Sequence, residues 1–513
     1  DDRGDHRTKP VELWAQGAAR VIINRGDATA SAPAVAALGF DVDDYEHAAR
    51  LVRAADHPAL GHCLDSFHIL SKGHDPEAIE TIPAEKIFFV QMADAPLLSL
   101  DVLSWSRHHR LFPGEGGFDL GPFLAHVART GYDGPVSLEV FNDIFRQSDP
   151  RATAVDARRS LRWLEDEAAR WLGSAAGGRA ARMSLSPLPS VEPPAGVNYV
   201  ELRTQAMDDM RALLAQLGFR AHGAHRTKDV ELWSQGAARI VLGRPDRPQP
   251  TVAGIGLSVR DRDIALRRAT ELFAPEIHRQ EGVDEEPLVG VRAPDGSEVF
   301  FGTEGGSEPG WVDEFGSPDD ESAPLVERVD HINLAQPWQH FDAGLLFFHS
   351  VLDLQTQPSM EVAAPVGLVR SQVLRSPDGI VRIALNLAPP AADSDDIHPQ
   401  HIAFAASDVL ALARAARGRG FRPLDIPANY YDDIAARFDI DAGLLADLAD
   451  LNVMYDRDES GEFLHFYTPP IGTIFLEVVE RRGGYDGYGA LNAPVRLAAQ
   501  YQQRREATAG AAA

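Results

Sequence analysis

Three short apolar stretches decide the architecture of the first part of this chain: LGHCLDSFHIL (60–70), KIFFVQMAD (86–94) and PVSLEVF (135–141). Few polar residues interrupt them, which is typical of strands buried on both faces of a parallel sheet. The sequence between and around them predicts helices at 45–55, 118–131 and 152–172. Strands that alternate with helices predict a parallel α/β unit, whose chemistry gathers at the carboxyl ends of its strands.

Each of these strands ends in polar residues that a buried strand would otherwise avoid: Asp65 with His68, then Gln91, then Glu139. Carboxylate and amide oxygens suit divalent ions such as Mg, Mn or Co. A metal ion there could polarise a substrate carbonyl while His68 removes an adjacent proton. A structural interpretation stays open for the single residues, since Asp65 could cap a turn and Glu139 could pair with an arginine.

The second half of the chain has a different rhythm. Short stretches alternate like half-exposed antiparallel strands, and helices at 208–218 and 408–420 lie between them. This pattern predicts paired βαβββ modules that build open, cupped sheets, an α+β architecture. The expected strands are 198–204, 238–243, 254–259, 329–335, 401–407 and 474–480.

Three residues of these strands form a possible metal-binding set: His331, His401 and Glu477. Two imidazoles and one carboxylate make the facial triad that leaves open positions on Fe(II). Glu477 lies within the apolar strand IFLEVVE, where a charge needs a partner, and a metal ion would supply one. The alternative is that both histidines are core residues and Glu477 faces solvent.

A repeat marks the start of the chain. HRTKPVELWAQGAARVIIN (6–24) returns as HRTKDVELWSQGAARIVLG (225–243), with 13 of 19 positions identical, and 33–44 echoes 250–261. Residues 1–44 are therefore interpreted as a duplicate of the later module. Together with the missing initial Met, the repeat predicts a truncated or recombined start. The basic HRTK motif is expected to be a solvated loop.

The remaining boundaries follow from composition. Stretches rich in Gly, Pro and small residues (173–196) or in acidic residues (302–324) predict linkers. The predicted organisation is a duplicated segment (1–44), a parallel α/β unit (45–172), two module pairs (197–301 and 325–495) and a frayed tail (496–513).

Charge and cysteine content narrow the class of protein. A net charge of −27 and a pI near 5.0 argue against nucleic acid and anionic membranes as partners. Cys63 is the only cysteine, is expected to pack inside its strand, and excludes an intramolecular disulfide. No apolar run approaches the roughly 20 residues of a membrane span. We expect a cytoplasmic protein that acts on a small molecule, and an open sheet edge makes a homo-oligomer possible.

Four motifs in the first block resemble the sugar-phosphate-isomerase-like TIM barrels, and among these the bacterial 3-dehydroshikimate dehydratases. They are LGHCLDSFHILSKG (60–73), FFVQMADAP (88–96), WSRHHRLFPGEGGFDL (105–120) and GPVSLEVFND (134–143). The resemblance implies that Asp65, Gln91 and Glu139 bind a divalent metal and that His68 is the base. It also makes Arg110 a candidate for holding the substrate carboxylate. The implied reaction is loss of water from 3-dehydroshikimate to give protocatechuate.

The first block departs from this family in two ways. A fourth ligand, a Glu on the preceding strand, would fall at Ala34 by the family spacing. The resemblance covers only 45–172, so the expected fold is a partial TIM barrel without its first strands, and activity could be impaired.

The second half resembles 4-hydroxyphenylpyruvate dioxygenase, a vicinal-oxygen-chelate fold, over about 197–495. The motifs are VDHI (329–332), QHIAF (400–404) and FLEVVERRGGYDGYG (475–489). The resemblance implies that His331, His401 and Glu477 bind Fe(II) or another divalent ion. The order of barrel, linker and dioxygenase-like half resembles fused bacterial dehydroshikimate dehydratases, in which the second half need not be a dioxygenase.

Three hypotheses therefore remain from the sequence. The first is a metal-dependent lyase of the dehydroshikimate dehydratase type in aromatic-acid catabolism. The second is an Fe(II)-dependent oxygenase of the hydroxyphenylpyruvate type. The third is a recombined chain that binds metal without turnover.

Overall fold

The computed structural model describes residues 2–5, 11–16, 19–24, 45–174, 183–245, 251–303, 309–318, 323–365, 367–387 and 400–511. The chain divides into two compact units. The first comprises 1–92, 122–137 and 175–184, and the second comprises 93–121, 138–174 and 185–513. Each unit is described by itself.

The first unit contains the parallel strands that the sequence predicts. β4 (His62–Asp65) runs parallel to β5 (Ile87–Met92), and β6 (Val136–Leu138) follows in the order β4-β5-β6. Helix α1 (Tyr45–Ala55) confirms the expected helix at 45–55, and α4 (Leu120–Arg129) forms within 118–131. The stretch 60–70 is not one strand, because Asp65 caps a short helix, α2 (Ser66–Leu70), and so ends β4.

The repeated segment folds in the same way twice. β2 (Val11–Gln16) and β3 (Ala19–Asn24) pair from Val11↔Asn24 to Gln16↔Ala19. In the second copy, β9 (Val230–Gln235) and β10 (Ala238–Gly243) pair in the matching register. The preceding strands, β1 (Asp2–Asp5) and β8 (Arg220–Ala224), add antiparallel to each hairpin. The repeated sequence therefore forms the same three-stranded arrangement in both copies.

The second HRTK motif (225–228) is only in part the solvated loop that the sequence suggests, because Arg226 and Thr227 are exposed and Lys228 is half-buried. His225 is buried, and its Nδ1 accepts hydrogen bonds from the backbone N–H groups of Thr227 and Lys228, each at 3.1 Å. Its Nε2 lies 2.7 Å from a carboxylate oxygen of Glu314, and Lys228 pairs with Glu285. The motif ties a turn to the module, which explains the side chains that recur there. His6 to Lys9 lie outside the described residues.

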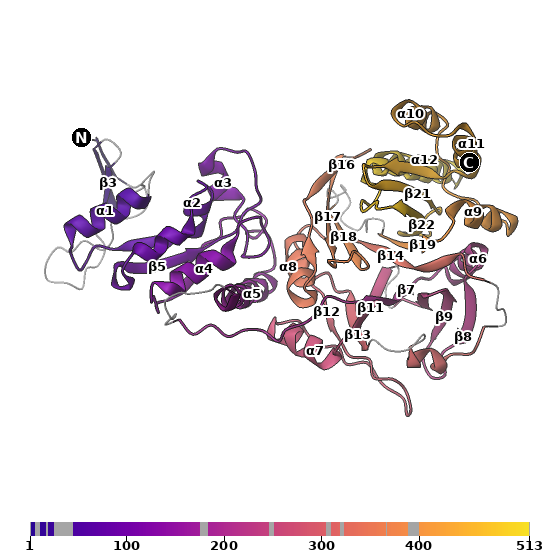
Figure 1. Cartoon of the computed structure of the whole chain (residues 1–513), viewed down its shortest axis with the longest axis horizontal. Helices are drawn as coiled ribbons and strands as arrows, with labels where there is room; N and C mark the ends of the chain where they lie inside the picture. Colours follow the sequence, from indigo (N-terminus) through magenta and orange to yellow (C-terminus); the bar gives the residue numbers. More distant parts are fainter. Residues whose placement is uncertain are drawn as a thin grey trace. The chain divides into compact units, whose positions relative to one another are not determined.

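Two sheets form most of the second unit (Figure 1). In the first, β7 (Gly196–Arg203) pairs parallel with β10 and antiparallel with β11 (Thr251–Val259). β11 in turn pairs parallel with β13 (Glu298–Thr303), and β12 (Gly290–Arg292) lies at the edge. The full order is β12-β13-β11-β7-β10-β9-β8.

The second sheet repeats this pairing of strands. β14 (Val326–Ala335) pairs parallel with β18 (Arg382–Leu387) and antiparallel with β19 (Gln400–Ala406), which pairs parallel with β22 (Ile474–Gly483). The predicted paired modules are confirmed. The remaining strands are β15 (Gln355–Thr356), β16 (Met360–Ala364), β17 (Gly367–Arg375), β20 (Met454–Arg457) and β21 (Gly461–Tyr467).

The helices of the two sheets start after equivalent strands. α6 (Met207–Leu217) and α7 (Arg262–Glu271) follow β7 and β11, as α8 (Phe341–Leu352) and α9 (Val409–Gly418) follow β14 and β19. Two helices have no counterpart in the first sheet, α10 (Asn429–Arg437) and α11 (Ala442–Leu451). Glutamine side chains link the sheets: Gln400 Oε1 accepts from Val252 N at 3.0 Å, and Gln235 Oε1 accepts from Val326 N at 2.8 Å.

Two predicted irregular segments are more ordered than composition suggests. Part of the expected acidic linker forms a 3-10 turn, η3 (Gly310–Glu314), whose Val312 belongs to the hydrophobic core of the first sheet. The expected tail from residue 496 is part of helix α12 (Ala493–Ala511). Arg496 and Gln500 lie four residues apart, hence on one helix face, and both are buried. This burial stabilises the helix that composition did not predict.

Helix α5 (Pro150–Ser174), which confirms the helix predicted at 152–172, is fixed within the second unit by a buried ion pair. Asp166 and Arg268 of α7 are each 1% exposed and lie 3.1 Å apart. Arg268 also donates to the carbonyls of Ser350 (2.7 Å) and Pro189 (3.1 Å). One desolvated pair therefore joins α5, α7, α8 and the chain segment before β7.

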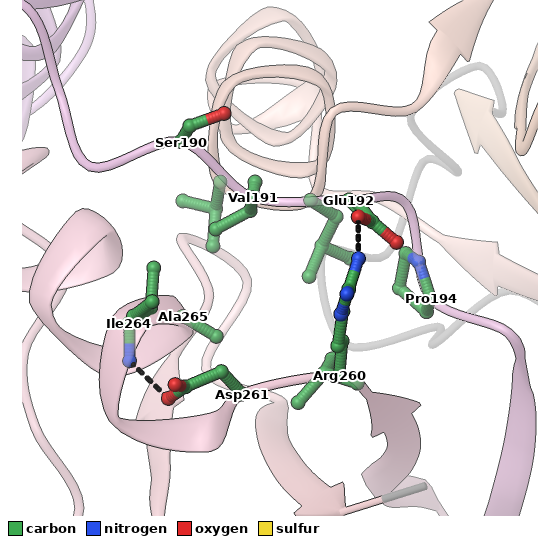
Figure 2. Close-up of a pocket in the computed structure, with 11 residues that line it drawn as sticks. Ser190, Val191, Glu192, Pro194, Arg260, Asp261, Ile264 and Ala265 are labelled. Carbon is green, nitrogen blue, oxygen red and sulfur yellow. Dashed lines mark hydrogen bonds and ion pairs between the residues drawn. The ribbon is translucent and has the colours of Figure 1, made fainter.

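That segment borders a cavity of about 370 Å³ beside α7. Figure 2 shows Arg260 paired with Glu192 and the Asp261 carboxylate accepting the N–H of Ile264 at 2.9 Å. The charged side chains of this wall, Glu192, Arg260 and Asp261, thus already have partners.

Three buried carboxyl groups meet where α5 and α8 pack. Glu115, Asp156 of α5 and Asp342 of α8 are between 4% and 6% exposed. Burial first, and then the neighbouring carboxylates, raise the pKa of Glu115 well above its ordinary value. The other charged groups at this junction are Arg159, Arg370 and His340. Glu115 therefore holds its proton to higher pH than an exposed glutamate does.

Within the described part of the chain, no helix combines the length and apolar character needed to cross a bilayer.

Replacing Arg268 by Met should destabilise the second unit by about 3 kcal/mol, because it leaves the Asp166 carboxylate buried with one fewer cation. Chemical denaturation followed by circular dichroism measures this loss. Arg267→Met, an exposed change on the same helix, is the control. Equal stability of the two variants would show that the pair contributes nothing.

Stability should fall as pH rises above about 4.5, the ordinary pKa of Glu115, because the native state then holds a proton that the unfolded chain has released. One such group contributes a slope of about −1.4 kcal/mol per pH unit until the native group ionises. Glu115→Gln cannot ionise, so its melting temperature should decline less steeply between pH 5 and 9. Parallel curves for wild type and variant would contradict this, and exposed Glu85→Gln serves as the control.

Candidate functional site

Asp65 lies at the carboxyl end of β4, and its two carboxylate oxygens have different neighbours. Oδ1 accepts the N–H groups of Phe67 (2.8 Å) and His68 (3.3 Å), which is the capping role that the structural interpretation foresaw. Oδ2 lies 3.8 Å from Nε2 of His68. The His68 side chain is 50% exposed, so solvent reaches its ring.

Gln91 stands directly beside Asp65, because the two residues are partners in the β4–β5 register. Its Oε1 accepts a hydrogen bond from the Cys63 thiol at 3.1 Å. Cys63 is exposed, and the expectation that it packs inside its strand is wrong. Alternate side chains of a strand face opposite sides, so Leu64 is buried while Cys63 and Asp65 share the other side.

The second unit holds the other two predicted barrel residues, Arg110 and Glu139. Arg110 is 1% exposed and donates to the Glu139 carboxylate at 3.2 Å and to the Glu139 carbonyl at 3.0 Å. Its Nη2 donates to Ser106 Oγ at 2.9 Å. Arg110 thus orients Glu139, as the structural interpretation of Glu139 allowed. Ala34 lies outside the described residues.

The second sheet brings His331, His401 and Glu477 together from β14, β19 and β22. Nε2 of His331 lies 3.1 Å from Nε2 of His401, and the two nitrogens lie 3.2 and 3.1 Å from Oε2 of Glu477. Glu477 is 1% exposed, so the alternative that it faces solvent is wrong.

These distances fit a metal ion. With bonds of about 2.1 Å, ligand atoms at neighbouring corners of an octahedron are roughly 3.0 Å apart. One ligand atom from each residue already meets that spacing. The three side chains could therefore hold a divalent ion and leave further positions open to a ligand.

A β-bulge aligns His331. The β14–β19 register shifts between Val329 and His331, so Asp330 is the extra residue of the bulge. Its carboxylate lies 2.8 Å from His331 Nδ1 and accepts from Arg481 Nε at 2.8 Å. This carboxylate–imidazole contact directs Nε2 of His331 toward the cluster, a common arrangement behind metal-binding histidines.

A third histidine, which the sequence did not single out, supports Glu477. His465 of β21 is fully buried, and its Nδ1 lies 2.7 Å from Oε1 of Glu477. Asn492 lies 2.9 Å from the other ring nitrogen. The alternation of Phe463, His465 and Tyr467 could have placed His465 on the face that carries Glu477, one strand away.

Hydrogen bonding outweighs burial in setting the pKa values of Glu477 and His331, but not that of His401. Burial would raise the pKa of Glu477, but hydrogen bonds from His331, His401 and His465 hold it well below its ordinary value. Burial would lower the pKa of His331, yet bonds to Asp330 and Glu477 raise it to about 9. Burial lowers the pKa of His401 to about 4. The cluster thus pairs one anionic carboxylate with one cationic and one neutral imidazole.

Comparison with known proteins adds the family. A family model of the xylose isomerase-like TIM barrel matches residues 34–167, and one of the N-terminal part of hydroxyphenylpyruvate dioxygenase matches 192–305. The 3-dehydroshikimate dehydratase of Pseudomonas aeruginosa is 42% identical over 500 residues, which cover 91% of this chain and 77% of that protein. The chain belongs to the 3-dehydroshikimate dehydratase family. The dehydratase of Pseudomonas putida is 40% identical over 497 residues, with the same coverage.

Solved structures agree with this dehydratase family and with its two-part architecture. A xylose isomerase-like TIM barrel/4-hydroxyphenylpyruvate dioxygenase fusion protein superposes with a TM-score of 0.80 and 40% identity, covering 91% of this chain and 77% of that one. A mutant 4-hydroxymandelate synthase from Streptomyces coelicolor gives a TM-score of 0.51 at 20% identity, over 61% of this chain and 99% of that one. The latter likeness shows the fold alone.

Asp330→Asn should weaken divalent-metal binding at the His331 cluster roughly 10- to 100-fold, since the amide no longer fixes the His331 ring as an anion does. Titration with Co(II), followed by its visible absorbance, measures the affinity. Asp447→Asn on exposed α11 is the control. Unchanged affinity in a folded Asp330 variant would show that this carboxylate does not support the cluster.

Proposed function

We propose that this chain removes water from 3-dehydroshikimate to give protocatechuate, assisted by a divalent metal ion. The observation that carries the proposal is the 42% identity, over 91% of the chain, to an enzyme named for this dehydratase activity. The side-by-side register of Asp65 and Gln91 at the ends of two parallel strands supports it. We also propose a cytoplasmic location, which the single Cys63 favours.

By the family resemblance, Asp65, Gln91 and Glu139 would hold the ion, with Mg, Mn or Co as the candidates. Their donor atoms are all oxygens, which suit a hard divalent ion. Such an ion supplies positive charge that polarises the substrate carbonyl.

His68 would act as the base. Its ring is half exposed and adjoins Asp65, so a substrate held there can present the proton next to its carbonyl. The imidazole takes this proton, the carbon–oxygen bond of the neighbouring hydroxyl breaks, and the hydroxyl leaves with a proton as water. The substrate thus loses one hydrogen and one hydroxyl group, which together make the released water molecule.

Arg110 has a different role in this proposal from the substrate contact that the family resemblance implied. Its guanidinium is buried and already donates to both Glu139 and Ser106. We therefore treat Arg110 as a positioning residue that orients Glu139.

A second candidate function is favoured by the His331, His401 and Glu477 cluster: Fe(II)-dependent oxygenation of a 2-oxo acid. Oxygen consumption by Fe(II)-loaded protein in the presence of 4-hydroxyphenylpyruvate tests it. Uptake that is lost in Glu477→Ala would support it, and absence of uptake with a full metal complement would exclude that substrate.

His68→Asn should lower the rate of protocatechuate formation about 10²- to 10⁴-fold, because a positioned general base is lost, while metal content stays the same. The assay mixes purified protein, 3-dehydroshikimate and Mg, Mn or Co and follows product absorbance. Exposed His57→Asn is the matched control.

Glu139→Gln should lower both metal content and rate, with Glu85→Gln as its control. A wild-type protein that contains metal yet forms no protocatechuate would overturn the proposed function. A His68 variant with an unchanged rate would overturn only the assignment of the base.

A further inference from the structure

Two aromatic rings extend the face of the sheet that carries the His331 cluster. Phe475 is the register partner of His401, and Tyr467 is the register partner of Glu477. Phe475 precedes Glu477 by two positions, so both project from the same side of β22. The Phe475 ring stacks on His401 with centroids 4.7 Å apart, and the Tyr467 ring meets His401 edge-on at 6.4 Å.

Arg496 of helix α12 lies over both rings. Its guanidinium carbon is 5.1 Å from the centroid of Phe475 and 5.5 Å from that of Tyr467. One aromatic ring therefore separates this cation from His401. Because Phe475 and Tyr467 share the face of the metal-binding cluster, Arg496 is on that face as well.

The charge of Arg496 is not balanced locally. The side chain is 8% exposed, and its Nη1 donates to Gln500 Oε1 at 2.9 Å. Across the described ranges, no carboxylate forms an ion pair with Arg496. Stacking on aromatic rings offsets part of the desolvation of a buried cation, but an anion would offset more.

Gln500 provides a second donor at the same place. It is 1% exposed, and its Nε2 lacks a hydrogen-bond partner within the described part of the chain. A buried N–H without an acceptor costs about 1 to 3 kcal/mol. A carboxylate that reached both side chains would satisfy the cation and the amide together, since guanidinium and amide donors suit its two oxygens.

We propose that Arg496 and Gln500 bind the carboxylate of a small ligand whose opposite end is held at the His331, His401 and Glu477 cluster. The inference rests on the proposed metal site. The ligand class is a flat carboxylic acid with two adjacent metal-chelating oxygens about one ring's length from the carboxylate. Protocatechuate, the product proposed for the barrel site, has this form.

The test uses the full-length chain carrying Glu139→Gln and loaded with Co(II), so that visible absorbance reports the second-sheet cluster. Protocatechuate and catechol, which differ only by the carboxylate, are titrated separately without oxygen. The Arg496→Gln change should weaken protocatechuate binding on the order of 10-fold or more and leave catechol unchanged. Arg496→Lys should restore part of the affinity, and Arg505→Gln, exposed on the same helix, should behave like the parent.

Metal content and circular dichroism, measured first, separate the possible failures. If the protein binds no Co(II) that the His331→Ala change removes, the proposed second-sheet metal site and this inference are both wrong. The dehydratase proposal would be unaffected. Equal binding of protocatechuate and catechol by a Co(II)-loaded, folded protein would overturn the role of Arg496 alone. Equal weakening of both ligands in Arg496→Gln would mean that the arginine supports the fold or the metal and not the carboxylate.

Discussion

The ion pair between Asp166 and Arg268 is the interaction on which the second unit depends. Both side chains are almost fully buried, so each charge needs the other, and their remaining hydrogen-bonding groups are met by backbone atoms. Leu188 N donates to Asp166 at 2.9 Å, which fixes the chain before β7 in the same network. A segment that resembles the last helix of a TIM barrel is thereby built into the dioxygenase-like half, and the boundary suggested by composition near residue 173 is not a boundary in packing.

The same rule, that a buried charge must be paired, shapes the His331 cluster. Glu477 is tolerated in the apolar first part of β22 because three imidazoles surround its carboxylate. Asp330 is tolerated behind His331 because Arg481 donates to both of its oxygens at 2.8 Å. Arg481 thus orients Asp330, and Asp330 orients His331. A cluster held this firmly has its ligand atoms at metal-binding spacing before any ion arrives, which lowers the reorganisation that binding would require.

Much of this architecture could be predicted from the sequence because it depends on local pattern. Strand alternation located β7, β10, β11, β14, β19 and β22, and residue type suggested His331, His401 and Glu477 as a metal-binding set. The features that could not be predicted depend on contacts between segments, which the sequence pattern does not reveal. The bulge at Asp330 follows from the register of β14 and β19, which lie far apart in the chain. The approach of His465 to Glu477 follows from the pairing of β21 with β22, and the burial of Arg496 from the packing of α12 over Phe475 and Tyr467.

The residues predicted for the barrel site show the same limit of prediction from sequence. Asp65 was expected either to bind metal or to cap a turn, and its two oxygens allow both, because one faces the helix N–H groups and the other lies toward His68. Arg110 was assigned to substrate, yet its burial and its bonds to Glu139 give it a carboxylate partner from its own chain. Arg496 presents the opposite case: it is also buried, but it forms no ion pair with a carboxylate of the described residues. An arginine that is already paired with a carboxylate of its own chain positions that carboxylate. An arginine without such a partner beside the His331 cluster is available to bind the carboxylate of a ligand.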